Sequence, residues 1–357
     1  LVRAFVPASQ IAHLTEWGAV QWIEEYVPPA LLNDFAVRGS HMNVTNVWHA
    51  HGLTGAGQVI GHADTGVDIG STNGIHPDFS GRIRAAFALG RPGNWSDPNG
   101  HGTHTAGSIL GGGNGGAGQF KGVAYEAELV HQSVMDAYGG LGGLPDDLND
   151  LYLQAYTNGA RIHSDSWGSS TYGSYTMDCR YSDEFMWDHK DMLLVYSAGN
   201  DGVDGDRNGV VDPDSIGSPA TAKNLLAVGA SENDRAPGTG GYTANTYGGA
   251  WPSDYPVNPL KDDYISQSAD RTNQGVCSFS SRGPTDDGRI KPDLLAPGTD
   301  VISCRSHAPG ANTGWGAHPN TNYIFEGGTS MACPLVAGAA ALARQFCIQM
   351  AGITNPS

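Results

Sequence analysis

Short apolar runs alternate with longer segments of helical spacing from residue 56 onward. The apolar runs predict strands over residues 58–64, 129–134, 160–164, 192–198 and 225–229. Residues 148–157 have the spacing of an amphipathic helix. Strands that are apolar along both faces are typical of a parallel sheet covered by helices on each side. The pattern therefore predicts an α/β fold built on a mainly parallel central sheet.

The first 32 residues follow a pattern of their own. Residues 8–14 have helical spacing, residues 20–26 read as a strand, and Pro28-Pro29 ends regular structure. The chain begins with Leu1 rather than methionine, so we expect its natural N-terminus, including any signal peptide, to be missing.

Composition narrows the choice of partners and cofactors. The 357 residues carry a formal net charge of -17, which disfavours nucleic acid and anionic membranes as partners. The apolar run at residues 336–343 is far shorter than the roughly 20 residues of a membrane span. Five cysteines without a Cys-x-x-Cys pair do not predict a disulfide framework or a zinc site. We expect Cys333 and Cys347 to act as small apolar residues.

Four polar residues stand where the predicted elements begin or end. Asp64 closes a buried strand, and His101 lies between glycines at the start of an apolar helical segment. Ser330 opens an Ala-rich helical run, and Asn200 follows the strand at 192–198. A serine hydroxyl needs a base, the base needs an orienting carboxylate, and an amide can donate to the developing oxyanion. Because ligands of such sheets bind beyond the carboxyl ends of the strands, these residues are candidates for one site.

Three segments resemble the signatures of the subtilisin-like serine proteases. They are Asp64-Thr65-Gly66, His101-Gly102-Thr103-His104 and Gly328-Thr329-Ser330-Met331-Ala332, in that order along the chain. Further segments similar to that family are Ser166-Trp167-Gly168, Ala198-Gly199-Asn200, residues 278–284 and residues 291–298. The similarity covers residues 50–350 and is greatest to a bacterial alkaline subgroup that carries an additional C-terminal β-domain.

The resemblance implies a role for each of these residues. Ser330 would be the nucleophile, His101 the general acid and base, and Asp64 the carboxylate that orients His101. Asn200 would form the oxyanion hole with the backbone amide of Ser330, whereas His104 would be structural. The implied protein is a secreted serine endopeptidase of broad specificity, with a three-layer subtilisin-like fold in which helices flank the sheet.

The resemblance also implies where an extended polypeptide substrate would bind. The segments Gly140-Leu141-Gly142 and Ser166-Trp167-Gly168 would be edges that pair with the substrate backbone. Gly217 would form the floor of the primary specificity pocket and leave it open to large side chains.

An acidic, glycine-containing segment at 201–214 predicts a structural calcium site. The candidate oxygen ligands are Asp204, Asp206, Asn208, the carbonyl of Val210, Asp212 and Asp214. They follow the first part of an EF-hand-type loop, but Ser215 stands where the closing glutamate would be. Because like charges repel unless a cation holds them, the sequence favours Ca2+ over a solvated acidic turn.

Members of this family are made with an inhibitory propeptide that the enzyme itself removes. By that resemblance, residues 1–32 would be the C-terminal remnant of the chain's own propeptide, with a cut near Leu32–Asn33. An ordinary N-terminal extension is the alternative. Residues 33–357 would be the catalytic domain, truncated at its C-terminus because the family's fold needs further elements after Ser330.

Two other classes of function share these sequence features. A transpeptidase or peptide cyclase would use the same acyl-enzyme but resolve it with an amine instead of water. A catalytically silent, calcium-binding protein of the same fold would lack a triad residue, and none is missing here. Hydrolysis is favoured because no segment suggests a lid that would exclude water.

Overall fold

The computed structural model describes residues 6–18, 20, 36–37, 42–235, 238–266, 275–312, 314–353 and 355–356. The chain divides into two compact units, Leu1–Leu31 and Leu32–Ser357. The first unit contains a 3-10 turn, η1 (Ala8–Gln10), and a short helix, α1 (Ile11–Thr15), where helical spacing is present. The predicted strand at 20–26, apart from residue 20, and the cut near Leu32–Asn33 lie outside the described residues.

The second unit is built on a seven-stranded sheet in which every neighbouring pair of strands is parallel. The strands are β1 (Val59–Asp64), β2 (Ile83–Ala88), β3 (Glu128–Ser133), β4 (Ile162–Asp165), β5 (Leu193–Ser197), β6 (Leu226–Ser231) and β7 (Leu294–Pro297). Their order across the sheet is β2-β3-β1-β4-β5-β6-β7. The α/β prediction is confirmed, and each of the five apolar runs forms a strand.

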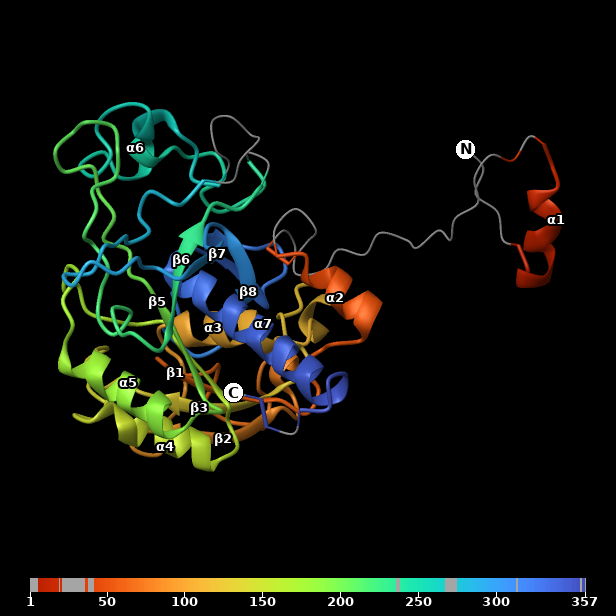
Figure 1. Ribbon diagram of the computed structural model, residues 1–357, viewed down its shortest axis with the longest axis horizontal. Helices are drawn as coiled ribbons and strands as arrows, with labels where there is room; N and C mark the ends of the chain where they lie inside the picture. The colour runs from red at the N-terminus through yellow and green to blue at the C-terminus, as the bar shows by residue number, and fades with distance from the viewer. Residues whose placement is uncertain are drawn as a thin grey trace. The chain divides into compact units, whose positions relative to one another are not determined.

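Helices cover both faces of this sheet (Figure 1). α3 (His101–Leu110) and α7 (Thr329–Gln349) pack on each other and supply one apolar core. α4 (Leu148–Thr157) and α5 (Met177–Asp188) pack on each other over the second core. The fold is therefore the expected three-layer arrangement. The remaining helical segments are α2 (Val44–His51), α6 (Tyr247–Ala250), η2 (Pro77–Phe79), η3 (Asn114–Gly116) and η4 (Leu260–Asp262).

A small antiparallel sheet packs against α3. Its strands are β8 (Val301–Cys304), β9 (Gly316–Ala317) and β10 (Tyr323–Glu326), in the order β8-β10-β9. The contact is close because Gly107 of α3 faces β8, where a Cβ atom would collide with Ser303 Oγ. Strand β10 leads through two glycines into α7, so it sets where the first turn of that helix begins.

α7 is longer than the apolar run at 336–343 suggests. Its 21 residues are long and apolar enough to cross a membrane, but 61% of its most apolar window is buried inside the protein. It contacts α3 and strands β4 to β7, so it is the central helix of the core. All five cysteines are free, and Cys333 on this helix is fully buried whereas Cys347 is half-buried.

Candidate active site

Four chain segments bring the predicted catalytic residues to the ends of their elements. Asp64 is the last residue of β1, and His101 is the first residue of α3. Asn200 follows β5, and Ser330 is the second residue of α7. Because β1 and β5 belong to one parallel sheet, their carboxyl ends lie at the same edge, where such folds place their sites.

Asp64 and His101 form a close, mostly buried pair. His101 Nδ1 lies 2.7 Å from Asp64 Oδ1, and the Asp64 side chain is 3% exposed. Burial acts to raise the pKa of Asp64, but the charges of His101 and His62 and their hydrogen bonds hold that pKa well below its ordinary value. Burial acts to lower the pKa of His101, and the Asp64 carboxylate reverses this and raises it to about 9. The pair is therefore suited to stabilise an imidazolium.

The Ser330 hydroxyl is held by the segment that follows β4. Ser330 Oγ donates to the carbonyl oxygen of Ser166 at 3.1 Å, and Ser166 Oγ donates to the carbonyl of Ser330 at 2.9 Å. If Ser330 is the nucleophile, its hydroxyl would have to rotate away from Ser166 before it could donate to His101. Ser330 also lies in the first turn of α7, where backbone N–H groups lack intrahelical acceptors.

The amide oxygen of Asn200 is occupied by hydrogen bonds, so its nitrogen is the end that could act as an oxyanion donor. Its Oδ1 accepts hydrogen bonds from Thr329 N at 2.8 Å and from Thr329 Oγ1 at 3.0 Å. These two bonds fix the amide, because the oxygen faces Thr329 and the Nδ2 group is left to donate elsewhere. A Cβ atom on Gly328 would lie 3.3 Å from Asn200 Nδ2, so glycine leaves room beside that donor.

His104 serves the fold. It is fully buried, and its Nε2 lies 3.0 Å from the carbonyl oxygen of Val301 on β8. Burial lowers its pKa to about 3, so it remains neutral at ordinary pH. A neutral histidine bonded to the small sheet connects α3 to β8, consistent with the structural role that the resemblance implies.

Two further buried histidines lie behind Asp64, and sequence reasoning did not identify them. His62 on β1 and His131 on β3 are register partners, and their Nδ1 atoms are 3.1 Å apart. His62 Nε2 lies 2.9 Å from Thr105 Oγ1, which donates to Asp64 Oδ2 at 3.1 Å. Thr105 Oγ1 also lies 3.2 Å from the His101 carbonyl and 3.1 Å from the Gly102 carbonyl; when its proton goes to Asp64 or to one of these carbonyls, Nε2 of His62 carries the proton that bonds Thr105. The sequence could have indicated that His62 lies near Asp64, because His62 precedes Asp64 by two residues and shares its face of the strand.

Asp97 is a second residue that sequence reasoning missed. Its Oδ1 accepts from Thr65 Oγ1 and Gly100 N, both at 2.8 Å. Its Oδ2 accepts from Thr103 N at 2.8 Å and from Thr103 Oγ1 at 2.6 Å. Burial raises its pKa despite these bonds. Asp97 therefore ties the segment after β1 to the first turn of α3 and positions His101.

The segment 166–168 and Gly217 directly precede Ser169 and Ser218, and the backbone pairs at these two serines. Ser169 N donates to the Ser218 carbonyl at 2.8 Å, and Ser218 N donates back at 3.0 Å. A Cβ atom on Gly217 would lie 2.7 Å from the carbonyl oxygen of Ser169. Gly168 is exposed, and Trp167 is anchored by a 3.1 Å bond from its Nε1 to the Ala63 carbonyl.

The segment 140–142 forms an exposed turn at the end of β3. Asp136 N donates to the Gly140 carbonyl at 2.9 Å, and Gly140 N donates back to Asp136 Oδ1 at 3.0 Å. Backbone amides that donate to the Asp136 carboxylate, Tyr138 N at 2.8 Å first and Gly140 N after it, lower the pKa of Asp136. Gly140 and Gly142 are exposed and Leu141 is half-buried, which leaves this backbone accessible to another chain.

In the acidic loop at residues 204–214, the carboxylates accept hydrogen bonds from backbone amides of the same loop. Asp204 is 1% exposed, and its carboxylate accepts from Asn208 N at 2.9 Å and from Gly209 N at 3.1 Å. Asp206 Oδ1 also accepts from Asn208 N, and Asp212 Oδ2 accepts from Gly205 N. Val210 N donates to Asn208 Oδ1.

Asp214 lies apart from these bonds, against Gly173 and beside Asp286. Among the described His, Cys, Asp and Glu side chains, only His76, Asp78 and Cys304 bring three ligand atoms within 4.8 Å of one another. Asp78 is already satisfied there, because it accepts from Gly113 N, Gly115 N and the Tyr323 hydroxyl.

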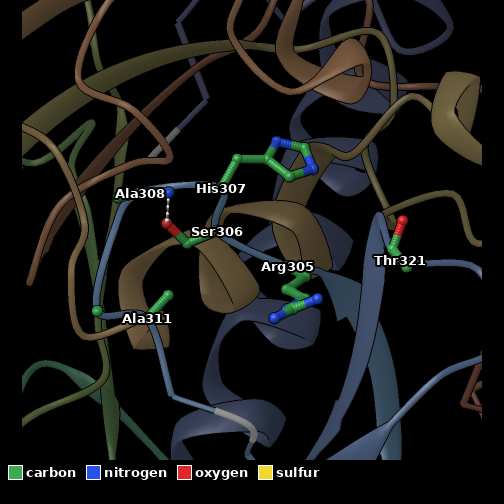
Figure 2. A pocket seen from close by; sticks show the side chains of 7 residues that line it. Arg305, Ser306, His307, Ala308, Ala311 and Thr321 are labelled. Carbon is green, nitrogen blue, oxygen red and sulfur yellow. Dashed lines mark hydrogen bonds between the residues drawn. The ribbon is translucent and has the colours of Figure 1, made fainter.

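A cavity of about 400 Å³ follows β8 and is lined by none of the catalytic residues (Figure 2). Its lining residues are Arg305, Ser306, His307, Ala308, Gly310, Ala311 and Thr321. Ser306 Oγ accepts from Ala308 N and donates to the carbonyl of Asp97 at 2.7 Å. The cavity wall thus supports the segment that carries His101.

Comparison with known proteins gives one consistent family. Residues 55–352 match the model described as the subtilase family, Peptidase S8. The chain is 31% identical to the serine protease/ABC transporter B family protein tagD of Dictyostelium discoideum, over 83% of this chain and 19% of that protein. It is 31% identical to the serine protease AprX of Bacillus subtilis, over 88% of this chain and 62% of that protein. The solved structure of the S41 psychrophilic protease superposes with a TM-score of 0.54 and 26% identity, covering 86% of this chain and 84% of the other. The chain thus spans less than two thirds of both curated relatives.

Proposed function

The chain belongs to the subtilase family and is a subtilisin-like serine peptidase, and we propose that it cleaves internal peptide bonds of polypeptides through an acyl-enzyme on Ser330, with broad specificity. The 2.7 Å bond between His101 Nδ1 and Asp64 Oδ1 is the observation that carries the proposal. It leaves Nε2 of His101 as the nitrogen that can accept a proton.

In the first half of the proposed reaction, the Ser330 oxygen attacks the carbonyl carbon of the scissile bond. The hydroxyl proton passes to His101 Nε2, and the charge of the imidazolium is balanced by Asp64. The oxyanion of the tetrahedral intermediate accepts from Asn200 Nδ2 and from the backbone amide of Ser330. When the carbon–nitrogen bond breaks, His101 returns the proton to the leaving amine.

In the second half, a water molecule takes the place of the amine. His101 removes a proton from water, the hydroxide adds to the acyl carbon, and the ester bond to Ser330 Oγ breaks. Ser330 recovers its proton from His101, and a carboxylic acid is released.

The proposed substrate is an extended chain that pairs with two accessible backbone edges, residues 140–142 and 166–168. Support comes from the exposure of Gly140, Gly142 and Gly168. Pairing through backbone groups is insensitive to side-chain identity, which agrees with broad specificity. Gly217 is proposed as the floor of the primary pocket, since it carries no side chain to fill the space between the paired stretches.

The Ser330→Ala variant tests this proposal. We expect kcat on casein and on a tetrapeptide anilide to fall at least about 1,000-fold, because no other hydroxyl takes its place. The exposed Ser253→Ala variant is the matched control and should retain full activity. Activity that survives in Ser330→Ala, with an unchanged melting temperature, would exclude the mechanism.

We also propose that the 204–214 loop binds a structural Ca2+. Support comes from the donor set, since the Asp204, Asp206 and Asp212 carboxylates and the Asn208 amide offer the hard oxygen atoms that Ca2+ prefers. The carbonyl of Val210 would add a ligand, and Asp214 would have to turn from Gly173 to complete the shell. The ion would stabilise the loop and takes no part in the reaction.

Secretion, zymogen processing and membership of a bacterial alkaline subgroup are further proposals. Secretion and the propeptide at residues 1–32 are supported by the family. The subgroup is supported by similarity to bacterial alkaline proteases, at 28% identity over 92% of this chain. If the chain processes itself, mass spectrometry should show loss of about the first 32 residues in wild type and an intact chain in Ser330→Ala. Equal masses would count against self-cleavage.

A further inference from the structure

A second cavity lies beside the catalytic residues and contains a buried acidic group. It has a volume of about 330 Å³ and is lined by Asn312, Gly314, Trp315, Glu326 and Gly327. Glu326 is the last residue of β10, four residues before Ser330. None of the lining residues belongs to the proposed substrate edges at 140–142 and 166–168.

One oxygen of the Glu326 carboxylate has no hydrogen-bond partner in the described part of the chain. Its residue is only 6% exposed, and Oε1 is buried with no hydrogen bond. An unpaired buried carboxylate is costly, so such a group in an enzyme cleft is a candidate for binding a ligand. Burial raises the pKa of Glu326 to about 7, and the charge of His101 opposes that rise. A cation placed in the cavity would favour the charged form of the acid.

The walls of the cavity suit the aliphatic part of a basic side chain. The Trp315 ring lies directly against Gly327, where any Cβ atom would collide with the indole. Trp315 is held in place by stacking on Tyr242, with ring centroids 4.9 Å apart, and by a 2.8 Å bond from its backbone N to the Phe325 carbonyl. Because Trp315 and Glu326 line the same cavity, the indole offers an apolar contact for the methylene groups of lysine or arginine, and the carboxylate offers a partner for their charge.

The cavity lies next to the position of the leaving group. His101 must protonate the leaving amine, so that amine lies against the imidazole, and Glu326 interacts electrostatically with His101. Asn312 also lines the cavity, and its N donates to the carbonyl of Asn99, two residues before His101, at 3.1 Å. A side chain on the leaving fragment can therefore reach the cavity while its backbone is at the catalytic centre.

From these observations we propose that Glu326 and Trp315 form a subsite for a lysine or arginine side chain in the leaving fragment of the substrate. The inference rests on the proposed peptide hydrolysis and adds a preference to one side of the cleaved bond. Glu326 acts here as a specificity-determining residue and takes no part in bond breaking.

Matched peptides test the subsite. They differ only in carrying lysine or its uncharged analogue norleucine at the first or second position after the cleaved bond. Wild type should cleave the better lysine peptide with a kcat/KM about tenfold higher or more than its norleucine partner. In Glu326→Gln this ratio should fall to about one, because the lysine side chain loses a carboxylate on which the norleucine side chain does not depend.

Controls separate this subsite from general electrostatics and from loss of fold. The exposed Glu184→Gln variant on α5 removes one negative charge elsewhere and should keep the wild-type ratio. If Glu326→Gln melts early, Glu326→Asp serves instead, and should keep a lysine preference because it keeps the charge. An unchanged lysine-to-norleucine ratio in a folded Glu326→Gln variant overturns the subsite and leaves the proposed function intact. Failure to cleave any peptide, or cleavage that survives Ser330→Ala, overturns the proposed function.

Discussion

At the scale of single residues, the Asp64 carboxylate connects the reacting groups to the interior. One oxygen faces His101 and accepts from Thr65 N at 2.7 Å, and the other accepts from Thr105 and lies 3.6 Å from His62 Nε2. A carboxylate bonded on both oxygens cannot turn, so it holds the His101 ring in one orientation and one tautomer.

The Asp64–His101 pair predicts an alkaline pH dependence. Asp64 raises the pKa of His101 above 6.5, and only neutral His101 can accept the Ser330 proton. Therefore kcat/KM should be low at acid pH and rise through the His101 pKa, with a midpoint above 6.5 and toward 9. A pH–rate profile on an uncharged peptide measures this midpoint, and a value at or below 6.5 would contradict the prediction.

The bond from His62 to Thr105 predicts a difference between two amide substitutions. In His62→Gln the side-chain NH2 can replace Nε2–H and bond Thr105, so kcat should remain within about threefold of wild type. In His62→Asn the shorter amide cannot reach Thr105, and kcat should fall about ten- to hundredfold with little change in KM, because Asp64 loses its orientation. Equal losses in both variants would instead indicate a general role in packing.

At the scale of elements, α3 carries His101 and depends on contacts at both of its ends. Asp97 bonds its first turn, and Gly107 allows β8 to approach closely. The limits of α3 and α7 follow from local sequence, since each begins after glycine and continues as an apolar run. The partners of each helix do not follow from local sequence, because β8 is about 200 residues from α3 in the chain.

The Gly107→Ala variant tests whether the close packing of β8 on α3 requires glycine at this position. Alanine favours a helix over glycine by about 1 kcal/mol, so helix propensity alone predicts stabilisation. The added methyl would collide with Ser303 and Cys304, so we expect a net loss of about 1–3 kcal/mol in the free energy of unfolding. Thermal unfolding should show a melting temperature lower by several degrees, about 2–4 °C per kcal/mol. An unchanged or higher melting temperature would show that β8 can move aside.

At the scale of the whole molecule, the net charge of -17 makes cations the natural partners of the surface. The 204–214 loop is one place where such a cation would be held, and the Glu326 cavity is another place for a positive group. The loop lies between β5 and β6, and Glu326 ends β10 of the small antiparallel sheet, so neither proposed site is part of the seven-stranded sheet.

Calcium removal tests the loop. With Ca2+ at about 100 to 1,000 times its dissociation constant, binding should stabilise the folded protein by about 3–4 kcal/mol, and a chelator should remove that gain. Asp204→Asn should lower the melting temperature in Ca2+ and abolish the effect of the chelator, whereas the exposed Asp146→Asn control should behave as wild type. A melting temperature that the chelator does not change would argue against the site.

The sequence alone determined the element types, the parallel sheet and the family to which the chain belongs. Hydrophobic period and glycine positions act locally, so β1, β3, α3 and α7 could be located from them. The proposed roles of Asp64, His101 and Ser330 came from the order of their motifs along the chain. These features can be recognised in the sequence because each depends on only a few neighbouring residues.

Only the tertiary structure decided which distant residues meet. His62 reaches Asp64 through a threonine 43 residues away, Asp97 joins two segments at the start of α3, and Glu326 is left unpaired beside His101. The chemical role of a histidine or glutamate in a strand cannot be assigned until its neighbours are known. Its burial, hydrogen bonding and charge depend on packing between elements. The residues of the proposed triad could therefore be named from the sequence, whereas the groups that orient Asp64 and His101 and the proposed leaving-side subsite emerged only from the fold.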